Sequence, residues 1–150
     1  MLRRMPGETE YAVHVAAFEN LDARTAYLLW RLRESVFVVE QQCAYAELDG
    51  RDLEDGTRHV WVTADAPVAY LRVLDDGAQA RIGRVLVARE HRGHGLASTL
   101  MQAALDIVGD RASVLDAQSY LAGWYTRFGY RQNGDEFLDD GIPHVPMIRP

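Results

Sequence analysis

Short apolar segments alternate with polar and glycine-containing segments along the whole chain, and their spacing predicts alternating strands and helices. Strands are predicted where β-branched residues gather, and helices where apolar residues recur every three or four positions. The first strand is predicted at residues 11–18. A helix follows, capped by Asn20 or Asp22, and its β-branched end at residues 36–39 is the part least committed to helix. The apolar face of this helix is expected to consist of Leu28, Leu32, Val36 and Val39.

Three strands are predicted in quick succession in the middle of the chain. Residues 47–58 are polar and contain glycine, which indicates a loop or a short helical turn before the first of them. The strands are expected at residues 59–63, 68–74 and 80–87. Because a proline turn and an Asp-Asp-Gly turn connect them, the pattern predicts an antiparallel meander.

The second half repeats the alternation. A loop at 88–94 precedes a helix with Leu96, Leu100, Ala103 and Ile107 on one face, which Gly109 and Asp110 end. A strand at 112–116, a short helix at 119–128 and a closing hairpin of 131–138 with 144–148 follow. The order β-α-β-β-β-α-β-α-β-β predicts an α+β (mixed α/β) fold. We expect one domain over residues 1–150, with residues 1–9 poorly ordered.

Composition narrows the function. All 16 basic residues are arginine, so the chain has no lysine for a Schiff base or for a triphosphate-binding loop. A net charge of −6 argues against non-specific nucleic-acid binding. The single cysteine, Cys43, excludes an intrachain disulfide framework and suggests a reducing compartment. No apolar run approaches the roughly 20 residues of a membrane helix, so we predict a soluble, cytoplasmic protein without a membrane partner.

The densest chemical signal is the glycine-containing loop at residues 92–97, RGHGLA, which follows an apolar strand and opens a helix. Free amides at a helix N-terminus bind anions, so this loop suits a phosphate or pyrophosphate, although such turns also occur for structural reasons alone. The dinucleotide fingerprint fails at its last position, where Ser98 replaces glycine or alanine.

The loop matches the pattern R-x-x-G-x-A through Arg92, Gly95 and Ala97, and here the chain resembles the GNAT acetyltransferase superfamily. Gln118, Tyr125 and the FGY segment at 128–130 are similar to the second signature of that superfamily, with Gln in place of the commoner Asn. The segments that resemble its ElaA-like branch are residues 32–33 with 36–41, 82–85, 92–97, 115–118 and 140–147. The resemblance implies a GNAT-like acyl-CoA N-acyltransferase fold, with a mostly antiparallel twisted sheet flanked by helices.

The resemblance also implies a coenzyme site. The pantetheine arm of acetyl-CoA is expected to pair with a strand edge, as an added strand does, and an amide of that strand to stabilise the oxyanion. Arg92 is expected either to assist as a cation or to be a solvated loop charge. Tyr125 is expected to be the general acid for the thiolate, or a core residue, and Trp124 to be structural. The implied coenzyme-binding residues are Val85, Leu86, Val87, Arg92, Gly93, His94, Gly95, Leu96, Ala97, Ser98, Gln118 and Tyr125.

A general base must take a proton from the acceptor amine. Glu40 is the first candidate, because it ends the first helix beside the expected acceptor site, and His144 is the second. Glu47 and Asp49 are further options, and each candidate could instead be structural. An acyl-cysteine mechanism through Cys43, with His59 or His144 as activator, is a minor alternative. No metal is expected, because the five histidines form no ligand pattern.

The predicted activity is transfer of an acetyl group from acetyl-CoA to a primary amine within a ternary complex. Acidic runs at residues 47–55 and 135–140 either are solvated loops or flank the acceptor site and favour a cationic small-molecule or peptide amine. The alternatives are a catalytically silent acyl-CoA-binding or regulatory module and, less supported, a nucleotide-binding module. The oligomeric state stays open between a monomer and a homodimer.

Overall fold

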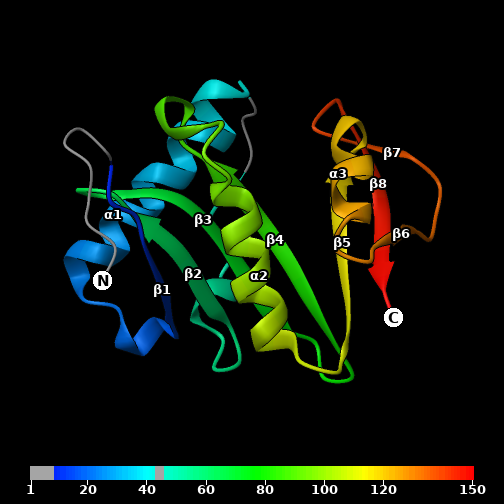
Figure 1. Ribbon diagram of the computed structural model, residues 1–150, viewed down its shortest axis with the longest axis horizontal. Helices are drawn as coiled ribbons and strands as arrows, with labels where there is room; N and C mark the ends of the chain where they lie inside the picture. Colours follow the sequence, from blue (N-terminus) through cyan, green and yellow to red (C-terminus); the bar gives the residue numbers. More distant parts are fainter. Residues whose placement is uncertain (1–8, 43–45) are drawn as a thin grey trace.

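Strands β1 to β4 form the antiparallel half of an eight-stranded sheet in the computed structural model, which describes residues 9–42 and 46–150 (Figure 1). Each strand pairs with the next along the chain, so the predicted meander is confirmed. The four strands are β1 (Ala12–Ala16), β2 (Arg58–Thr63), β3 (Pro67–Asp75) and β4 (Gln79–Val87).

The C-terminal half of the sheet is built around strand β8 (Ile142–Arg149), which pairs antiparallel with β5 (Ala112–Gln118), β6 (Arg131–Gln132) and β7 (Phe137–Asp139). The single strand predicted at 131–138 is therefore wrong, because it divides into β6 and β7. Gly134 lies between them, where an added Cβ would come within 2.7 Å of the Pro146 side chain. The predicted hairpin turn is formed by Asp140 and Gly141, both with positive φ.

Strands β4 and β5 join the two halves and are the parallel pair of the sheet. Their ladder has only three positions, Gln79–Arg81 against Ala112–Val114. Beyond it a register shift in the β3–β4 pairing marks a bulge, and there Arg84 adopts a left-handed φ of 56°. The strands then diverge, as Figure 1 shows, and within the described residues one edge of β4 is left without a strand partner. The sheet is mostly antiparallel, as predicted.

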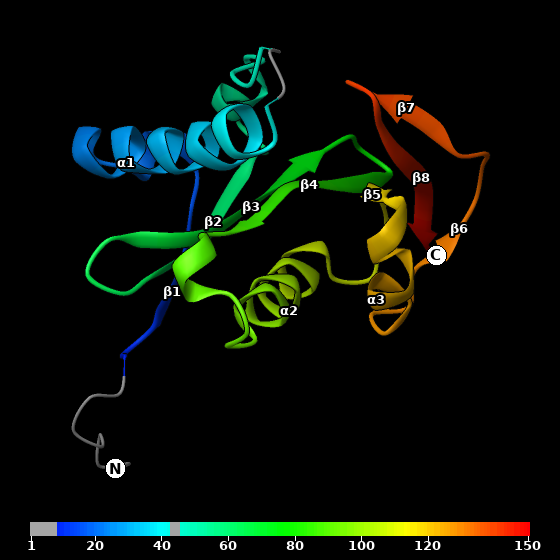
Figure 2. The same cartoon turned by 90° about the horizontal axis from the view of Figure 1, so that it is seen from above.

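Helix α1 (Ala23–Arg33) covers one face of the sheet (Figure 2). Its N-cap is Asp22, whose carboxylate accepts a 2.7 Å hydrogen bond from the Thr25 amide. The helix then widens into a π-helix, η2 (Glu34–Glu40). The predicted apolar face is wrong at Leu28, since Leu29 is the fully buried leucine of this helix. It is also wrong at Val39, which is 64% exposed, because the wider π turn rotates it away from the sheet.

Helices α2 (Leu96–Val108) and α3 (Ala122–Thr126) cover the opposite face (Figure 2). The expected positions Ala103 and Ile107 are only partly buried, and Ala104 and Val108 fill the core instead. Because i+4 spacing drifts slowly around a helix, either pair fits the sequence pattern. The short helix predicted at 119–128 is a 3-10 turn, η5 (Ser119–Leu121), followed by α3.

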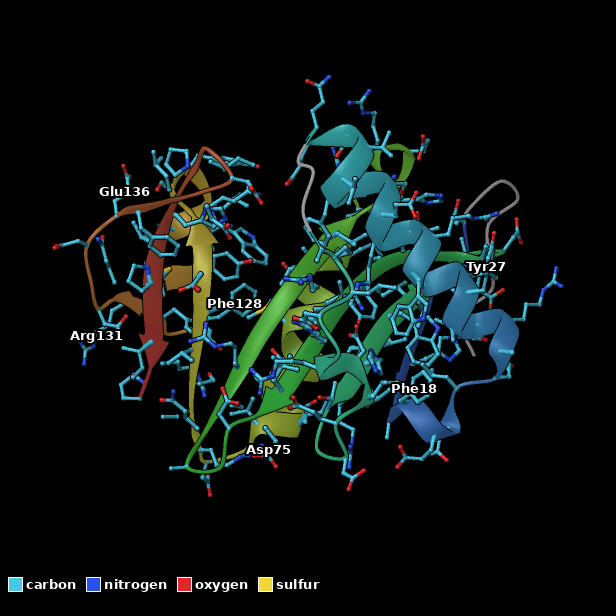
Figure 3. The ribbon with its side chains drawn as sticks, turned by 180° about the vertical axis from the view of Figure 1, so that it is seen from behind. Phe18, Tyr27, Asp75, Phe128, Arg131 and Glu136 are labelled. Carbon is cyan, nitrogen blue, oxygen red and sulfur yellow. The ribbon has the colours of Figure 1, made fainter. Side chains whose placement is uncertain are left out.

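Three further 3-10 turns connect the elements: η1 (Phe18–Asn20), η3 (Arg51–Leu53) and η4 (Arg89–His91). The larger apolar core lies between α2, α3 and the sheet, and a smaller one between α1 and the sheet. We call the V-shaped arrangement of the diverging strands β4 and β5 the fork. Figure 3 shows the α1 face, with Asp75 at the tip of the β3–β4 hairpin, at the end of the fork where the two strands still pair. The fork opens at the opposite end, next to the loop that leads into α2.

Candidate active site

A cleft of about 640 Å³ occupies the fork between β4 and β5. Its walls come from β4, the loop before α2, the start of α3 and the β7–β8 turn, and the end of η2 reaches its rim. Most of the predicted site residues line it, from segments far apart in the sequence. Those are Glu40, Val85, Leu86, Val87, Arg92, Gly93, Gly95, Leu96, Ala97, Ser98, Gln118, Tyr125 and His144.

The β4 edge offers main-chain groups to the cleft. The Ala88 amide donates to the Val68 carbonyl on the β3 side, so the alternation of an antiparallel ladder turns the groups of Leu86 toward β3 and those of Val87 toward the fork. The Val87 carbonyl accepts a 3.0 Å hydrogen bond from Arg92 Nε on that open side. The β4 edge can therefore pair with an extended ligand.

The loop before α2 has the conformation that an anion site needs. Gly93 and Gly95 both adopt left-handed φ angles, 84° and 73°, and an added Cβ on either would meet nothing within 4 Å. Gly95 is the N-cap of a 13-residue helix and provides no side-chain cap. The first amides of α2 are thus available to a phosphate. His94 is not among the cleft-lining residues, and its ring lies 6.1 Å from that of Tyr11.

Glu40 at the end of η2 is bound by two arginines of this loop region. One carboxylate oxygen accepts a 2.7 Å hydrogen bond from Arg92 Nη2, and the other lies 3.3 Å from Arg89 Nε. The hydrogen bond from Arg92 holds the pKa of Glu40 below its usual value. Glu40 therefore fixes Arg92 at the mouth of the cleft and stays ionised.

Tyr125 on α3 is 6% exposed and lines the cleft. Its ring packs edge-on against Trp124 and Tyr130. Burial raises the pKa of its hydroxyl, which has no hydrogen-bond partner within residues 9–42 and 46–150. Tyr125 thus combines the core role with a protonated hydroxyl at the cleft. Trp124 also lines the cleft, in addition to packing against Phe128.

His144 in β8 also lines the cleft, from the C-terminal half of the sheet. Its Nδ1 lies 2.7 Å from the Ile142 carbonyl oxygen, which can only accept, so Nδ1 carries the proton. The neutral ring then has its lone pair on Nε2. The imidazole also stacks on Phe137, with ring centroids 5.8 Å apart, which limits its rotation.

The first acidic run is divided between buried ion pairs and the surface, where Asp49, Glu54 and Asp55 are exposed. Glu47 and Asp52 are buried, and the fully buried Arg33 binds both, at 2.7 and 2.8 Å. Asp49 forms a bidentate pair with Arg72, whose hydrogen bond lowers the pKa of that carboxyl. The expectation that residues 47–55 attract a cationic amine to the acceptor site is therefore wrong for Glu47, Asp49 and Asp52, because their charges are paired with arginines. In the second run Asp139 and Asp140 are exposed and line the cleft.

His59 belongs to this buried network and not to the cleft. Its Nε2 donates to the Asp52 carbonyl at 3.1 Å, so its Nδ1 accepts from the Tyr70 hydroxyl at 2.6 Å. Burial lowers the pKa of His59. The alternative that pairs His59 with Cys43 falls partly on a residue outside the described ones.

Three arginines of this network were not predicted from the sequence: Arg33, Arg72 and Arg84. The signal was present, because Arg72 interrupts the apolar run of β3 and Arg33 takes a core position of α1. Within the described residues, no group of three or more His, Cys, Asp or Glu side chains could hold a metal ion. The helices in the same part of the chain are too short or too polar to cross a membrane.

Comparison with known proteins places this geometry in context. Residues 30–149 match the family model described as an acetyltransferase (GNAT) domain. A UPF0039 protein of Mycobacterium tuberculosis (strain H37Rv) is 51% identical over 138 residues, which cover 88% of this chain and 88% of that protein. Protein ElaA of Escherichia coli K12 is 38% identical over 139 residues, which cover 87% of this chain and 90% of that protein.

Two solved structures have the same fold as this chain. The crystal structure of an acyl-CoA N-acyltransferase from Pseudomonas aeruginosa superposes with a TM-score of 0.89 at 38% identity, covering 94% of this chain and 100% of that one. The crystal structure of Escherichia coli ElaA has a TM-score of 0.88 at 34% identity, with the same coverage of 94% and 100%. The chain therefore has the same fold as these two proteins of known structure.

Proposed function

This chain belongs to the GNAT acetyltransferase family, in its ElaA-like branch, and on that premise we propose that it is an acetyl-CoA-dependent N-acetyltransferase. The observation that carries the proposal is the fork itself. An open β4 edge leads into a helix N-terminus without a side-chain cap, and the buried Tyr125, whose hydroxyl has no hydrogen-bond partner among the described residues, also lines the cleft.

Acetyl-CoA fits the residues that line the fork. The pantetheine arm would pair with the β4 edge at Val85 and Val87, while the pyrophosphate would take amides of residues 93–98. The left-handed glycines support this fit, since open space surrounds both α-carbons. Arg92 would add one positive charge at the pyrophosphate, held in place by Glu40.

The reaction is direct transfer. The acceptor amine attacks the thioester carbonyl carbon, an N–C bond forms, and the oxyanion is stabilised by an amide of residues 85–87. The C–S bond then breaks, and Tyr125 gives its proton to the departing thiolate. The raised pKa of Tyr125 supports this role, because it keeps the hydroxyl protonated until a thiolate develops. An ammonium acceptor loses one proton to the general base before attack, and that proton passes to solvent. The amine loses a second proton when the N–C bond forms, and a proton from solvent restores Tyr125, so the products are an amide, coenzyme A and one released proton.

His144 is the better supported base of the two first candidates. Its proton sits on Nδ1, so the lone pair of Nε2 is available to an incoming ammonium group. The oxygens of Glu40 are engaged by Arg92 and Arg89, and an ionised carboxylate with a lowered pKa is a weak proton acceptor. We therefore assign Glu40 to the coenzyme side and His144 to the acceptor side.

Two measurements test the function. Calorimetry with acetyl-CoA should give one site per chain, and thiol release should accelerate with a primary amine chosen from a chemically diverse panel. No binding at millimolar acetyl-CoA overturns the proposal. Binding without thiol release for any amine would leave the silent acyl-CoA-binding module as the function.

A pair of variants tests the assignment of the base. His144→Asn should lower kcat about 100-fold with little change in acetyl-CoA affinity, because general base catalysis contributes roughly 10²- to 10⁴-fold. Glu40→Gln should weaken acetyl-CoA binding and leave kcat nearly unchanged at saturation. The opposite pattern, with turnover lost in Glu40→Gln only, would return the base role to Glu40.

A further inference from the structure

We propose that Arg33 and Glu47 are positioning residues that act through Arg84 to hold the β4 bulge, and with it the amide that receives the oxyanion. This inference rests on the proposed function for its kinetic part. Neither Arg33 nor Glu47 lines the cleft, and both are buried. Their influence on the reaction therefore has to pass through the residues between them and β4.

The chain of contacts is short and charged throughout. Arg33, at the end of α1, binds the Glu47 carboxylate through Nε at 2.7 Å and the Glu47 carbonyl through Nη2 at 3.2 Å. Arg84 reaches the same residue from β4, with Nε 3.1 Å from the carboxylate and Nη2 3.1 Å from the carbonyl. Glu47 is thus bound by two guanidinium groups, one from α1 and one from β4.

Further ion pairs hold Arg33 and Arg84 in place around Glu47. Arg33 Nη1 also donates to Asp52 at 2.8 Å, and Asp49 holds Arg72 on the neighbouring strand β3. Arg84 lies 3.5 Å from the same Asp49 oxygen. Three arginines and three carboxylates therefore join the end of α1, the segment after residue 46 and strands β3 and β4.

Arg84 is the point where this network meets the reaction. Its φ of 56° is unfavourable for a residue with a Cβ by roughly 1–2 kcal/mol, so the surrounding contacts have to maintain it. The residue also sits at the bulge, where the register of β3 and β4 shifts, and it lines the cleft. Its successors are residues 85–87, which offer the oxyanion amide. A tilt of the peptide after Arg84 would misdirect that amide.

Loosening the network should therefore affect the transition state more than coenzyme binding. The pyrophosphate contacts at residues 93–98 lie on another element and would persist. An oxyanion donor that is absent costs about 100- to 1,000-fold in kcat, so a donor that is only misdirected should cost about 10- to 100-fold.

The test uses Glu47→Gln, which keeps the shape of the side chain and removes its charge. The matched control is Glu54→Gln, a carboxylate of the same region that pairs with Arg51 at the surface, outside the contacts that join Arg33, Glu47 and Arg84. Arg84→Gly is a second variant, since it removes the tether and glycine accepts the left-handed φ without the penalty of a Cβ. Hydrogen exchange of the amides at residues 84–87 is measured in the free protein, and kcat and KM for acetyl-CoA are measured below the melting temperature.

We expect exchange at residues 84–87 to be about 10-fold faster in Glu47→Gln and Arg84→Gly than in Glu54→Gln, because a local opening becomes cheaper. In both variants kcat should fall while KM for acetyl-CoA stays nearly constant. The double variant Glu47→Gln/Arg84→Gly should be no slower than Arg84→Gly alone, since both changes break the same chain of contacts. Exchange equal to that of the control overturns the positioning role whatever the activity. Parallel loss of coenzyme affinity and kcat also overturns it. A wild-type protein without turnover refutes the proposed function, while the exchange result stands by itself.

Discussion

The loop glycine Gly95 offers a direct test of the coenzyme site through the variant Gly95→Val. Its φ of 73° disfavours any residue with a Cβ, although open space surrounds the α-carbon. Gly77, in the turn between β3 and β4, has a φ of 83° and equally open surroundings. Gly77→Val is therefore a matched control, which shares the backbone penalty and lies at the closed end of the fork.

The structure separates the two expected effects. The left-handed conformation should cost each variant about 1–2 kcal/mol of folding free energy, equivalent to a fall in Tm of roughly 2–8 °C for a chain of this size. Only Gly95→Val should lose coenzyme affinity, because its side chain would occupy the space in which a phosphate approaches the loop amides. Losing one charge-assisted hydrogen bond of about 1.5–3 kcal/mol raises Kd roughly 10- to 150-fold.

Isothermal calorimetry with acetyl-CoA and thermal unfolding of both variants measure these quantities. An acetyl-CoA Kd for Gly95→Val within threefold of that for Gly77→Val, with Tm values equally lowered, would refute the assignment of this loop to the pyrophosphate. The comparison cancels the stability loss that both variants share.

Three further predictions follow from the buried polar groups. Tyr125→Phe should lower kcat about 100-fold in thiol-release assays and leave Tm and acetyl-CoA affinity unchanged, since its hydroxyl has no partner among the described residues; full activity would make it a packing residue only. Arg33→Met should lower the free energy of unfolding, measured with urea, by about 3 kcal/mol, because it leaves the buried carboxylates of Glu47 and Asp52 with fewer cations. A decrease below about 1 kcal/mol would contradict the stabilising role of this network. Burial lowers the pKa of His59 in the folded state, so its contribution to stability is complete above roughly pH 6.5 and is lost as the pH falls toward that lowered pKa. Urea unfolding at pH 7.5 and 5.5 should therefore show a smaller loss in His59→Gln than in the wild type, and equal losses would exclude this source of pH dependence.

Much of the fold could be predicted from local pattern. The meander followed from turn residues between β-branched runs, and the cap of α1 is Asp22, one of the two predicted residues. The errors came from long-range contacts. Val39 is exposed because the π-helix changes the turn, and residues 131–138 divide into two strands because Gly134 lies against Pro146. Neither cause is visible within a local window.

The site was only partly predictable for a similar reason. A glycine loop is contiguous in sequence, so its residues could be named, and most of them line the cleft. Glu40 and His144 were chosen by position, and the sequence could not reveal that Arg92 engages one while Ile142 fixes the tautomer of the other. The acidic run at 47–55 suggested solvent or substrate, because its pairing with Arg33, Arg72 and Arg84 depends on α1, β3 and β4, which lie elsewhere in the chain.

The open edge of β4 also bears on how the protein behaves in solution. Unpaired main-chain groups on a strand are a template for any other extended segment, and most proteins cover or interrupt such edges. Here the edge lies inside the sheet, where Arg92 caps the Val87 carbonyl and the exposed Asp139 and Asp140 stand on the facing wall. A coenzyme seated along β4 would seal the remaining gap and add RT ln(1 + [L]/Kd) to the stability. Preparations kept saturated with coenzyme A should accordingly resist aggregation on heating better than coenzyme-free ones.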